Sequence, residues 1–163
     1  MPVFAIPKPH LSDLRMVTHQ SAGEHSLNSM IPQEHIIGYP LDNLCHLGEF
    51  LLLMHWRDPN SPCTLFKSDV AEAYRLLLVH PYWQIKQANC IGSSLHINRN
   101  CAFGGRGSGC NWITFMSLVS WIVKKKCNIE PLGTYVDDTF RPELAMNVTY
   151  YEHYQKFMPT NQV

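Results

Sequence analysis

The sequence predicts an α+β fold, because strand patterns joined by turn residues occur beside two stretches of helical character. The strand-like residues fall into three hairpins, at 3–17, 83–101 and 134–140. Apolar residues recur at helical spacing over 41–56, and an apolar run at 112–123 is expected to be a buried helix. With 163 residues, the chain is long enough for one domain with its own core, so we expect one compact unit.

The composition is that of a globular protein and leaves the partner open. Thirteen basic and thirteen acidic residues give a formal net charge of 0, which argues neither for nor against nucleic acid. The six cysteines form no CxxC pair, so we expect reduced thiols in an intracellular protein of the cytoplasm or nucleus. No basic segment precedes an apolar run at the N-terminus, and no run reaches the roughly 20 residues of a membrane span. We therefore expect no secretory signal and no membrane association.

The first hairpin carries two cations. Residues 3–6 and 14–17 have the β-branched and apolar character of strands, and Pro7, Pro9 and the polar residues between them predict a loop. Lys8 lies in this loop and Arg15 near the start of the returning strand, so both can point to one side. The alternative is two ordinary solvated cations. An irregular connection is expected at 19–40.

Three aspartates are the candidate catalytic and metal-binding residues. The 134–140 stretch predicts two strands around a tight turn that holds Asp137 and Asp138 at an exposed tip. Two carboxylates so close repel each other, and a divalent cation shared with a third oxygen ligand would hold them together. Asp69 ends another predicted strand, at 63–70, and supplies that third carboxylate. The alternative is a solvated Asp-Asp turn.

Three further stretches have weaker signals. A glycine-rich loop at 103–109 precedes the apolar helix and would let a backbone approach a ligand, or would simply be a tight turn. Lys124, Lys125 and Lys126 follow this helix, where cations favour a helix C-terminus on a solvated face. The polar, tyrosine-rich tail at 147–163 is expected to be helical, with no partner element after it.

In this order, the motifs resemble those of reverse transcriptases, the RNA-directed DNA polymerases of retroelements such as retrotransposons. Residues 67–75 are similar to the family's motif A, 103–112 to motif B, and 135–138, with the sequence YVDD, to motif C. Residues 3–8, with Leu14-Arg15 and Leu27-Asn28, are similar to the fingers hairpin and its exit. The resemblance covers the fingers and most of the palm, to about Phe140.

The resemblance implies a fold, an activity and a site. The fold is a fingers and palm fragment, with the palm a ferredoxin-like antiparallel sheet backed by helices, truncated before the thumb. The implied partial domain has a fingers hairpin and connection at 1–40, a palm at 41–140 with a fingers-side hairpin at 83–101, and a tail at 141–163. The implied activity is template-directed nucleotidyl transfer by two Mg²⁺ ions, for which Mn²⁺ can substitute. Catalytic roles fall on Asp69, Asp137 and Asp138, metal binding on these three and the Val70 carbonyl, and nucleotide binding on Lys8, Arg15, Tyr74, Phe103, Gly104 and Arg106.

The implied partners are an RNA or DNA template with its primer, and deoxynucleoside triphosphates; the oligomeric state stays open. The chain departs from the family pattern at His19-Gln20, where a carboxylate is frequent, and at Gly109, where motif B usually has proline. We expect no thumb or RNase H domain in this chain, so its grip on a duplex should be weak. Two alternatives stay open: an inactive, truncated retroelement remnant, and a nucleic-acid or protein interaction module that uses Lys124–Lys126 and the aromatic tail.

Overall fold

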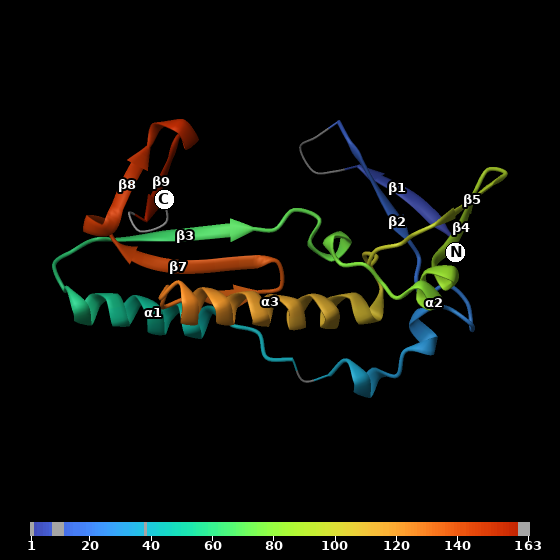
Figure 1. Cartoon of the computed structure of the whole chain (residues 1–163), viewed down its shortest axis with the longest axis horizontal. Helices are drawn as coiled ribbons and strands as arrows, with labels where there is room; N and C mark the ends of the chain where they lie inside the picture. Colours follow the sequence, from blue (N-terminus) through green and yellow to red (C-terminus); the bar gives the residue numbers. More distant parts are fainter. Residues whose placement is uncertain (1, 8–11, 38, 160–163) are drawn as a thin grey trace. The chain divides into compact units, whose positions relative to one another are not determined.

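The computed structural model describes residues 2–7, 12–37 and 39–159, which form a mixed fold of antiparallel sheets and three α-helices (Figure 1). The chain divides into two compact units, each built from two separate stretches of sequence. The first comprises Met1–Tyr39 with Glu72–Phe115, and the second Pro40–Ala71 with Met116–Val163. The predicted α+β class is confirmed at this level.

Two of the predicted hairpins lie in the first unit. β1 (Val3–Pro7) pairs antiparallel with β2 (Leu14–Thr18), as the sequence predicts. β4 (Ala88–Ile91) pairs antiparallel with β5 (Ser94–Ile97), so this hairpin is shorter than predicted. The predicted strand at 83–87 is wrong. Its place is taken by short helical turns, because Pro81 at the first helical position and the His80 cap start α2 (Pro81–Gln84).

The helix α3 (Arg106–Lys126) begins six residues before the predicted start at 112. The side-chain Oδ1 of Asn28 accepts a hydrogen bond of 2.7 Å from the Arg106 backbone N–H, which satisfies a donor that the helix start leaves free. The glycines at 107 and 109 therefore belong to the helix rather than to a loop. Sequence spacing alone does not show a cap that lies 78 residues away along the chain.

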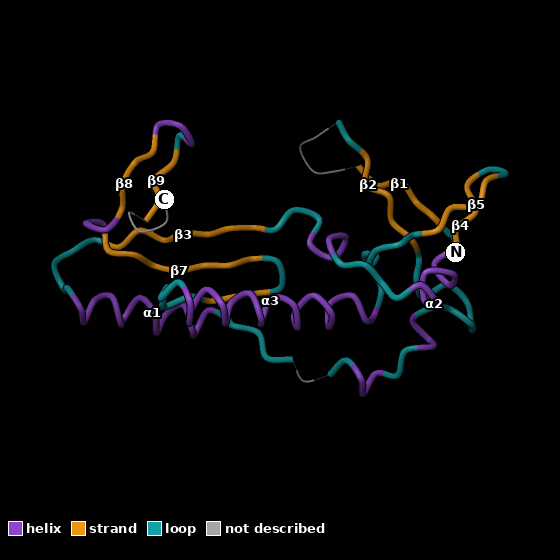
Figure 2. Tube along the Cα trace, viewed as in Figure 1, coloured by secondary structure: helices purple, strands orange, loops and turns teal. Residues whose placement is uncertain are grey.

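The second unit is organised on a three-stranded antiparallel sheet of order β3-β7-β6. β3 (Cys63–Asp69) pairs with β7 (Asp138–Leu144) over the full length of both strands (Figure 2). β6 (Gly133–Tyr135) pairs with the start of β7. The helix α1 (Leu44–Arg57) contacts β7. It starts three residues after the predicted position, because the Asn43 side chain caps its first turn. Short 3₁₀ turns occupy Asn28–Met30, Gln33–His35, Ala73–Leu76, Ile85–Gln87, Ala145–Asn147 and Glu152–Tyr154.

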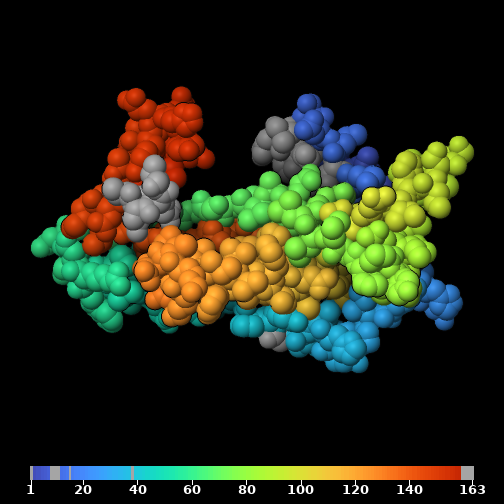
Figure 3. Space-filling model, in the orientation of Figure 1, coloured from blue at the N-terminus to red at the C-terminus, as the bar shows by residue number. Residues whose placement is uncertain are grey.

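The apolar run of α3 is only partly buried, so the prediction of a buried helix is wrong. Trp112, Met116 and Ser120, each four residues apart, are buried, whereas Leu118 and Trp121 are 56% and 53% exposed. A helix turns about 100° per residue, so an apolar run on all sides can present only one stripe to the core. Figure 3 shows the surface of the second half of α3 uncovered on the visible face.

The tail also differs from the prediction. Its described part is not helical but forms a hairpin of β8 (Val148–Tyr151) and β9 (Lys156–Pro159), joined around Gln155 at φ +50°. Tyr150 and Phe157 face each other across the pair with ring centroids 5.0 Å apart. Cross-strand aromatic pairs and β-branched residues favour strands, and this outweighs the polar character that suggested a helix.

Three smaller observations complete the fold. All six cysteines are unpaired, as predicted. Lys124, Lys125 and Lys126 form the last turn of α3, and Lys125 Nζ lies 3.9 Å from Glu130 Oε1. Within the described residues, no helix has both the length and the apolar character that crossing a membrane requires.

Gly133 provides a test of the sheet. It is buried opposite Phe140 in the β6–β7 pair, and a Cβ atom there would overlap the Phe140 ring. We expect Gly133→Ala to lower the free energy of unfolding by about 1–3 kcal/mol, because the ring must shift within a packed layer. Urea unfolding followed by circular dichroism measures this change.

The matched control is Gly48→Ala in the interior of α1, where an added Cβ meets no atom within 4 Å. This variant should gain about 0.5–1 kcal/mol from helix propensity. Equal stability of the Gly133→Ala variant and the parent chain would contradict the packing of β6 on Phe140.

Candidate active site

The three predicted catalytic aspartates lie together at one end of the β3-β7-β6 sheet. Asp69, the last residue of β3, is the cross-strand partner of Asp138, the first residue of β7. The Val70 backbone N–H donates a hydrogen bond of 3.1 Å to the backbone carbonyl of Asp137, which extends the pairing by one step. Residues directly opposite on antiparallel strands have neighbouring side chains on the same face. Backbone pairing therefore brings Asp69 and Asp138 together.

The turn between β6 and β7 consists of Val136 and Asp137, one residue earlier than the predicted Asp137-Asp138 turn. Val136 has φ +55°, which is costly for a β-branched residue. Such strain persists only when the surrounding structure fixes the backbone. Here the Tyr135–Asp138 pair on one side and the Val70–Asp137 hydrogen bond on the other fix both ends of the turn.

Lys67 is a cation in direct contact with one of the carboxylates. Its Nζ lies 2.9 Å from Asp138 Oδ2, and the two side chains are 63% and 28% exposed. Lys67 and Asp69 are two residues apart on β3, so both share one face of the sheet with Asp138. The hydrogen bond to Asp138 raises the pKa of Lys67, and the charges of Asp138, Asp69 and Asp137 raise it further. Lys67 offsets part of the repulsion between the carboxylates.

The carboxylates are open to solvent and supply only oxygen ligands. Asp69 is exposed, and Asp137 and Asp138 are half-buried. Among the described residues, no three His, Cys, Asp or Glu side chains already stand in position to hold one metal ion. The fold thus places Asp69 and Asp138 opposite each other, and their role as metal ligands stays a prediction.

Tyr74 and Phe103, two of the predicted nucleotide-binding residues, are in contact within the first unit. Their ring centroids are 5.3 Å apart, and Tyr74 also meets buried Trp112 edge-on at 6.5 Å. Tyr74 lies in the 3₁₀ turn that follows β3, and Phe103 in the turn that precedes α3. Aromatic packing therefore joins residues from the two stretches that resemble motifs A and B.

Gly104 and Arg106 are held by the same side chain. Asn28 Nδ2 donates to the Gly104 carbonyl at 2.9 Å, while Asn28 Oδ1 accepts from the Arg106 N–H. Gly104 has φ +82°, a conformation that favours glycine. The Arg106 guanidinium donates from Nη1 to the Ile31 carbonyl at 3.0 Å. Asn28 thus fixes the entry to α3.

Two predicted nucleotide-binding residues, Lys8 and Arg15, have no described side chain. Lys8 lies outside the described residues, and for Arg15 only the backbone position in β2 is described. Lys67 and Asn28 were not among the predicted site residues, although both lie in the stretches that carry the family resemblance. The alternation of residues on β3 could have indicated Lys67, since residues 67 and 69 must share a face.

Comparisons with known proteins identify the fold. Scans against models of protein families and against curated proteins gave no match. Among solved structures, the chain is similar to a foamy viral protease-reverse transcriptase in complex with double-stranded DNA, with a TM-score of 0.60, 18% identity, and 89% of this chain and 22% of that chain covered. It is also similar to the native protease-reverse transcriptase of prototype foamy virus, with a TM-score of 0.55, 15% identity, and 97% and 22% covered.

The chain therefore spans about a fifth of the length of these two structures. At these identities the similarity concerns the fold, and the whole proteins' activities do not follow from it. The described residues have a partial reverse-transcriptase-like fold.

Proposed function

We propose that this chain is the fingers and palm part of an RNA-directed DNA polymerase of a retrotransposon. The observation that carries the proposal is the Asp69–Asp138 cross-strand pair, with Asp137 adjacent in the turn, at the open end of the sheet. The partial reverse-transcriptase-like fold supports it. In this proposal, residues 1–40 and 83–101 belong to the fingers, 41–140 otherwise form the palm, and 141–163 follow it.

The chemistry of the carboxylates suits Mg²⁺. This ion usually takes one or two protein carboxylates and completes its shell with water and phosphate oxygens, so a preformed cage of three side chains is not required. Asp69, Asp137 and Asp138, with the Val70 carbonyl, would be the protein ligands. Two bound ions would activate the primer 3′-hydroxyl and stabilise the leaving pyrophosphate.

The chain's own residues would select and orient the nucleotide. Tyr74, held by Phe103 and Trp112, would reject a ribose 2′-hydroxyl by its bulk. Lys8 and Arg15 would contact the triphosphate, and Phe103, Gly104 and Arg106 would shape the nucleotide pocket. The partners would be a primed RNA or DNA template and deoxynucleoside triphosphates; one of the similar structures contains double-stranded DNA.

Primer extension on an RNA template with Mg²⁺ or Mn²⁺ tests the activity. The double variant Asp137→Asn, Asp138→Asn should lose incorporation by about a thousandfold or more, because metal assistance contributes several kcal/mol to such transfers. Glu49→Gln, which removes one exposed carboxylate from α1, is the control and should retain activity.

Incorporation that survives in the double variant would contradict the assigned site. If neither chain incorporates nucleotides while Mn²⁺ still binds through Asp69, the result would favour an inactive remnant that keeps the site.

A second prediction concerns Lys67. Because its ammonium contacts Asp138, it competes with a metal ion for that carboxylate. We expect Lys67→Met to bind Mn²⁺ about fivefold more tightly, since its loss removes a positive charge that repels the metal ion and occupies a carboxylate oxygen. Asp69→Asn should weaken binding. Electron paramagnetic resonance titration of free Mn²⁺ measures both affinities.

Lys125→Met is the matched control. Lys125 is 62% exposed, like Lys67, and also faces a carboxylate, that of Glu130 at 3.9 Å, but it belongs to α3 and not to the sheet that carries the aspartates. Its loss should leave Mn²⁺ affinity unchanged. Equal affinities of the Lys67→Met variant and the parent chain would show that Lys67 does not compete with the metal.

A further inference from the structure

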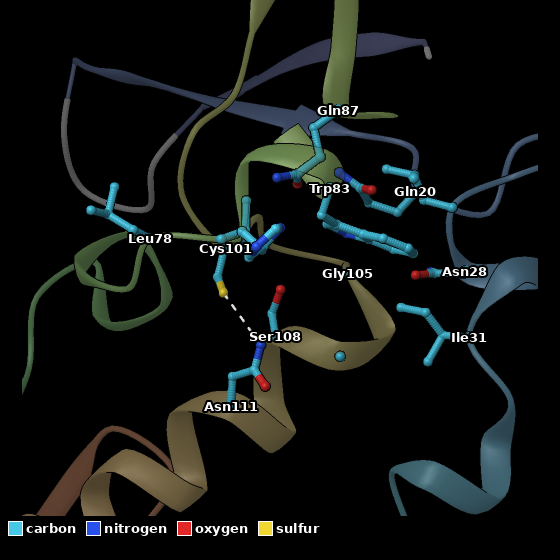
Figure 4. Close-up of a pocket in the computed structure, with 14 residues that line it drawn as sticks. Gln20, Asn28, Ile31, Leu78, Trp83, Gln87, Cys101, Gly105, Ser108 and Asn111 are labelled. Carbon is cyan, nitrogen blue, oxygen red and sulfur yellow. Dashed lines mark hydrogen bonds between the residues drawn. The ribbon is translucent and has the colours of Figure 1, made fainter. Parts of the chain in front are cut away.

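The first unit contains a pocket of about 350 Å³ that the predicted site does not include. Its walls come from the segment after β2, the segment around α2 and the start of α3 (Figure 4). This volume is at the lower end of the range of small-molecule sites, so one ring system of modest size fits.

Apart from the His80 imidazole, the side chains that line the pocket are apolar or polar without a formal charge. Its fourteen lining residues include no Lys, Arg, Asp or Glu. Burying an ion without a partner is costly, so a phosphate, a carboxylate or an ammonium group is a poor occupant of the interior. The interior suits a neutral group.

An aromatic ring provides a stacking surface. Trp83 of α2 lines the pocket and, in the view of Figure 4, lies between Gln20 and Gln87 on one side and Ser108 on the other. Leu27 and Ile31 add apolar surface. A flat ring can stack on an indole and fill this space.

Two buried amides present acceptors to that space. Gln87 is 3% exposed, and its Nε2 donates to the carbonyls of Asn98 and Asn100, so its Oε1 is left for a ligand. Gln20 is also 3% exposed, and its Nε2 donates to Thr18 Oγ1 at 2.8 Å. Neither oxygen accepts a hydrogen bond from the described residues, and both side chains line the pocket. A ligand with N–H donors on its edge would satisfy them.

Two cations flank the neutral interior. Lys86 Nζ lies 5.0 Å from the Trp83 ring centroid, and the Arg106 guanidinium bonds the carbonyl of the lining residue Ile31. Both side chains are exposed. A neutral interior with cations at its edge suits a ligand that consists of an uncharged ring and an attached anionic group.

We propose that this pocket binds an unpaired nucleobase with an exocyclic amino group, such as adenine, while Lys86 and Arg106 contact its phosphate. The proposal extends the polymerase function with a subsite for a base of a single strand, but it uses none of the aspartates. Such recognition combines stacking with hydrogen bonds to the base edge.

The test titrates the whole chain with adenosine by ligand-observed NMR, in the absence of metal ions. For a ligand of this size we expect a Kd on the order of 0.1 mM. N6,N6-dimethyladenosine lacks the amino donors and should bind about fivefold more weakly, because the amide oxygens then stay unpaired. Adenosine 5′-monophosphate should bind a few-fold more tightly than adenosine, and Lys86→Met should remove this gain.

Gly107→Leu blocks the pocket. Gly107 lines it within α3, and a Cβ there would meet only Ile31 Cδ1, at 3.5 Å, so the longer side chain extends into open space. The substitution also favours the helix, so the variant should stay folded. We expect adenosine binding to fall at least about tenfold. Gly48→Ala in α1 is the control with unchanged binding.

Unchanged binding in Gly107→Leu, or equal affinity for adenosine and its dimethyl analogue, would overturn the proposal. The Asp137→Asn, Asp138→Asn variant separates the two proposals, because it should bind adenosine as the parent chain does. If primer extension fails while adenosine binding is lost in Gly107→Leu, the pocket assignment stands and the polymerase assignment falls.

Discussion

The pairing of β3 with β7 is the constraint on which the candidate site depends. Backbone hydrogen bonds over seven residues of each strand set the register that puts Asp69 opposite Asp138. The two carboxylates repel each other in this position. The pairing of the two whole strands outweighs this repulsion, and the positive charge of Lys67 offsets part of it. A shift of the register by one residue would turn one carboxylate to the other face.

Much of the fold was predictable where local chemistry decides. The β1–β2 and β6–β7 hairpins were predictable, and the β4–β5 hairpin in part, because glycine, proline and aspartate mark their turns. The strand that ends at Asp69 was predictable from its β-branched and aromatic residues. The start of α3 was not predictable, because its cap comes from Asn28. The tail at β8 and β9 was missed because cross-strand packing of Tyr150 on Phe157, not composition, decides its form.

The candidate site was predictable only in part for the same reason. The YVDD stretch and the strand end identified the three aspartates, but their proximity follows from pairing between distant segments. The contact of Lys67 with Asp138 needs the strand register, and the presence of Gln20, Trp83 and Gln87 around one pocket needs the fold of the first unit. The sequence motifs thus indicated which side chains are candidate metal ligands. Tertiary packing determined which other side chains lie next to them.

The way the two units share the chain has a consequence for dissecting the protein. Each unit consists of two stretches with a stretch of the other between them, so Glu72–Phe115 separates β3 from β7. Closing so long a loop is entropically costly and slows folding. During synthesis, the carboxylate end of the sheet can form only after both stretches of the first unit have been made. No contiguous subclone can contain either unit whole without the intervening stretch of the other. Isolating one unit therefore requires deleting that stretch and joining the two segments that flank it.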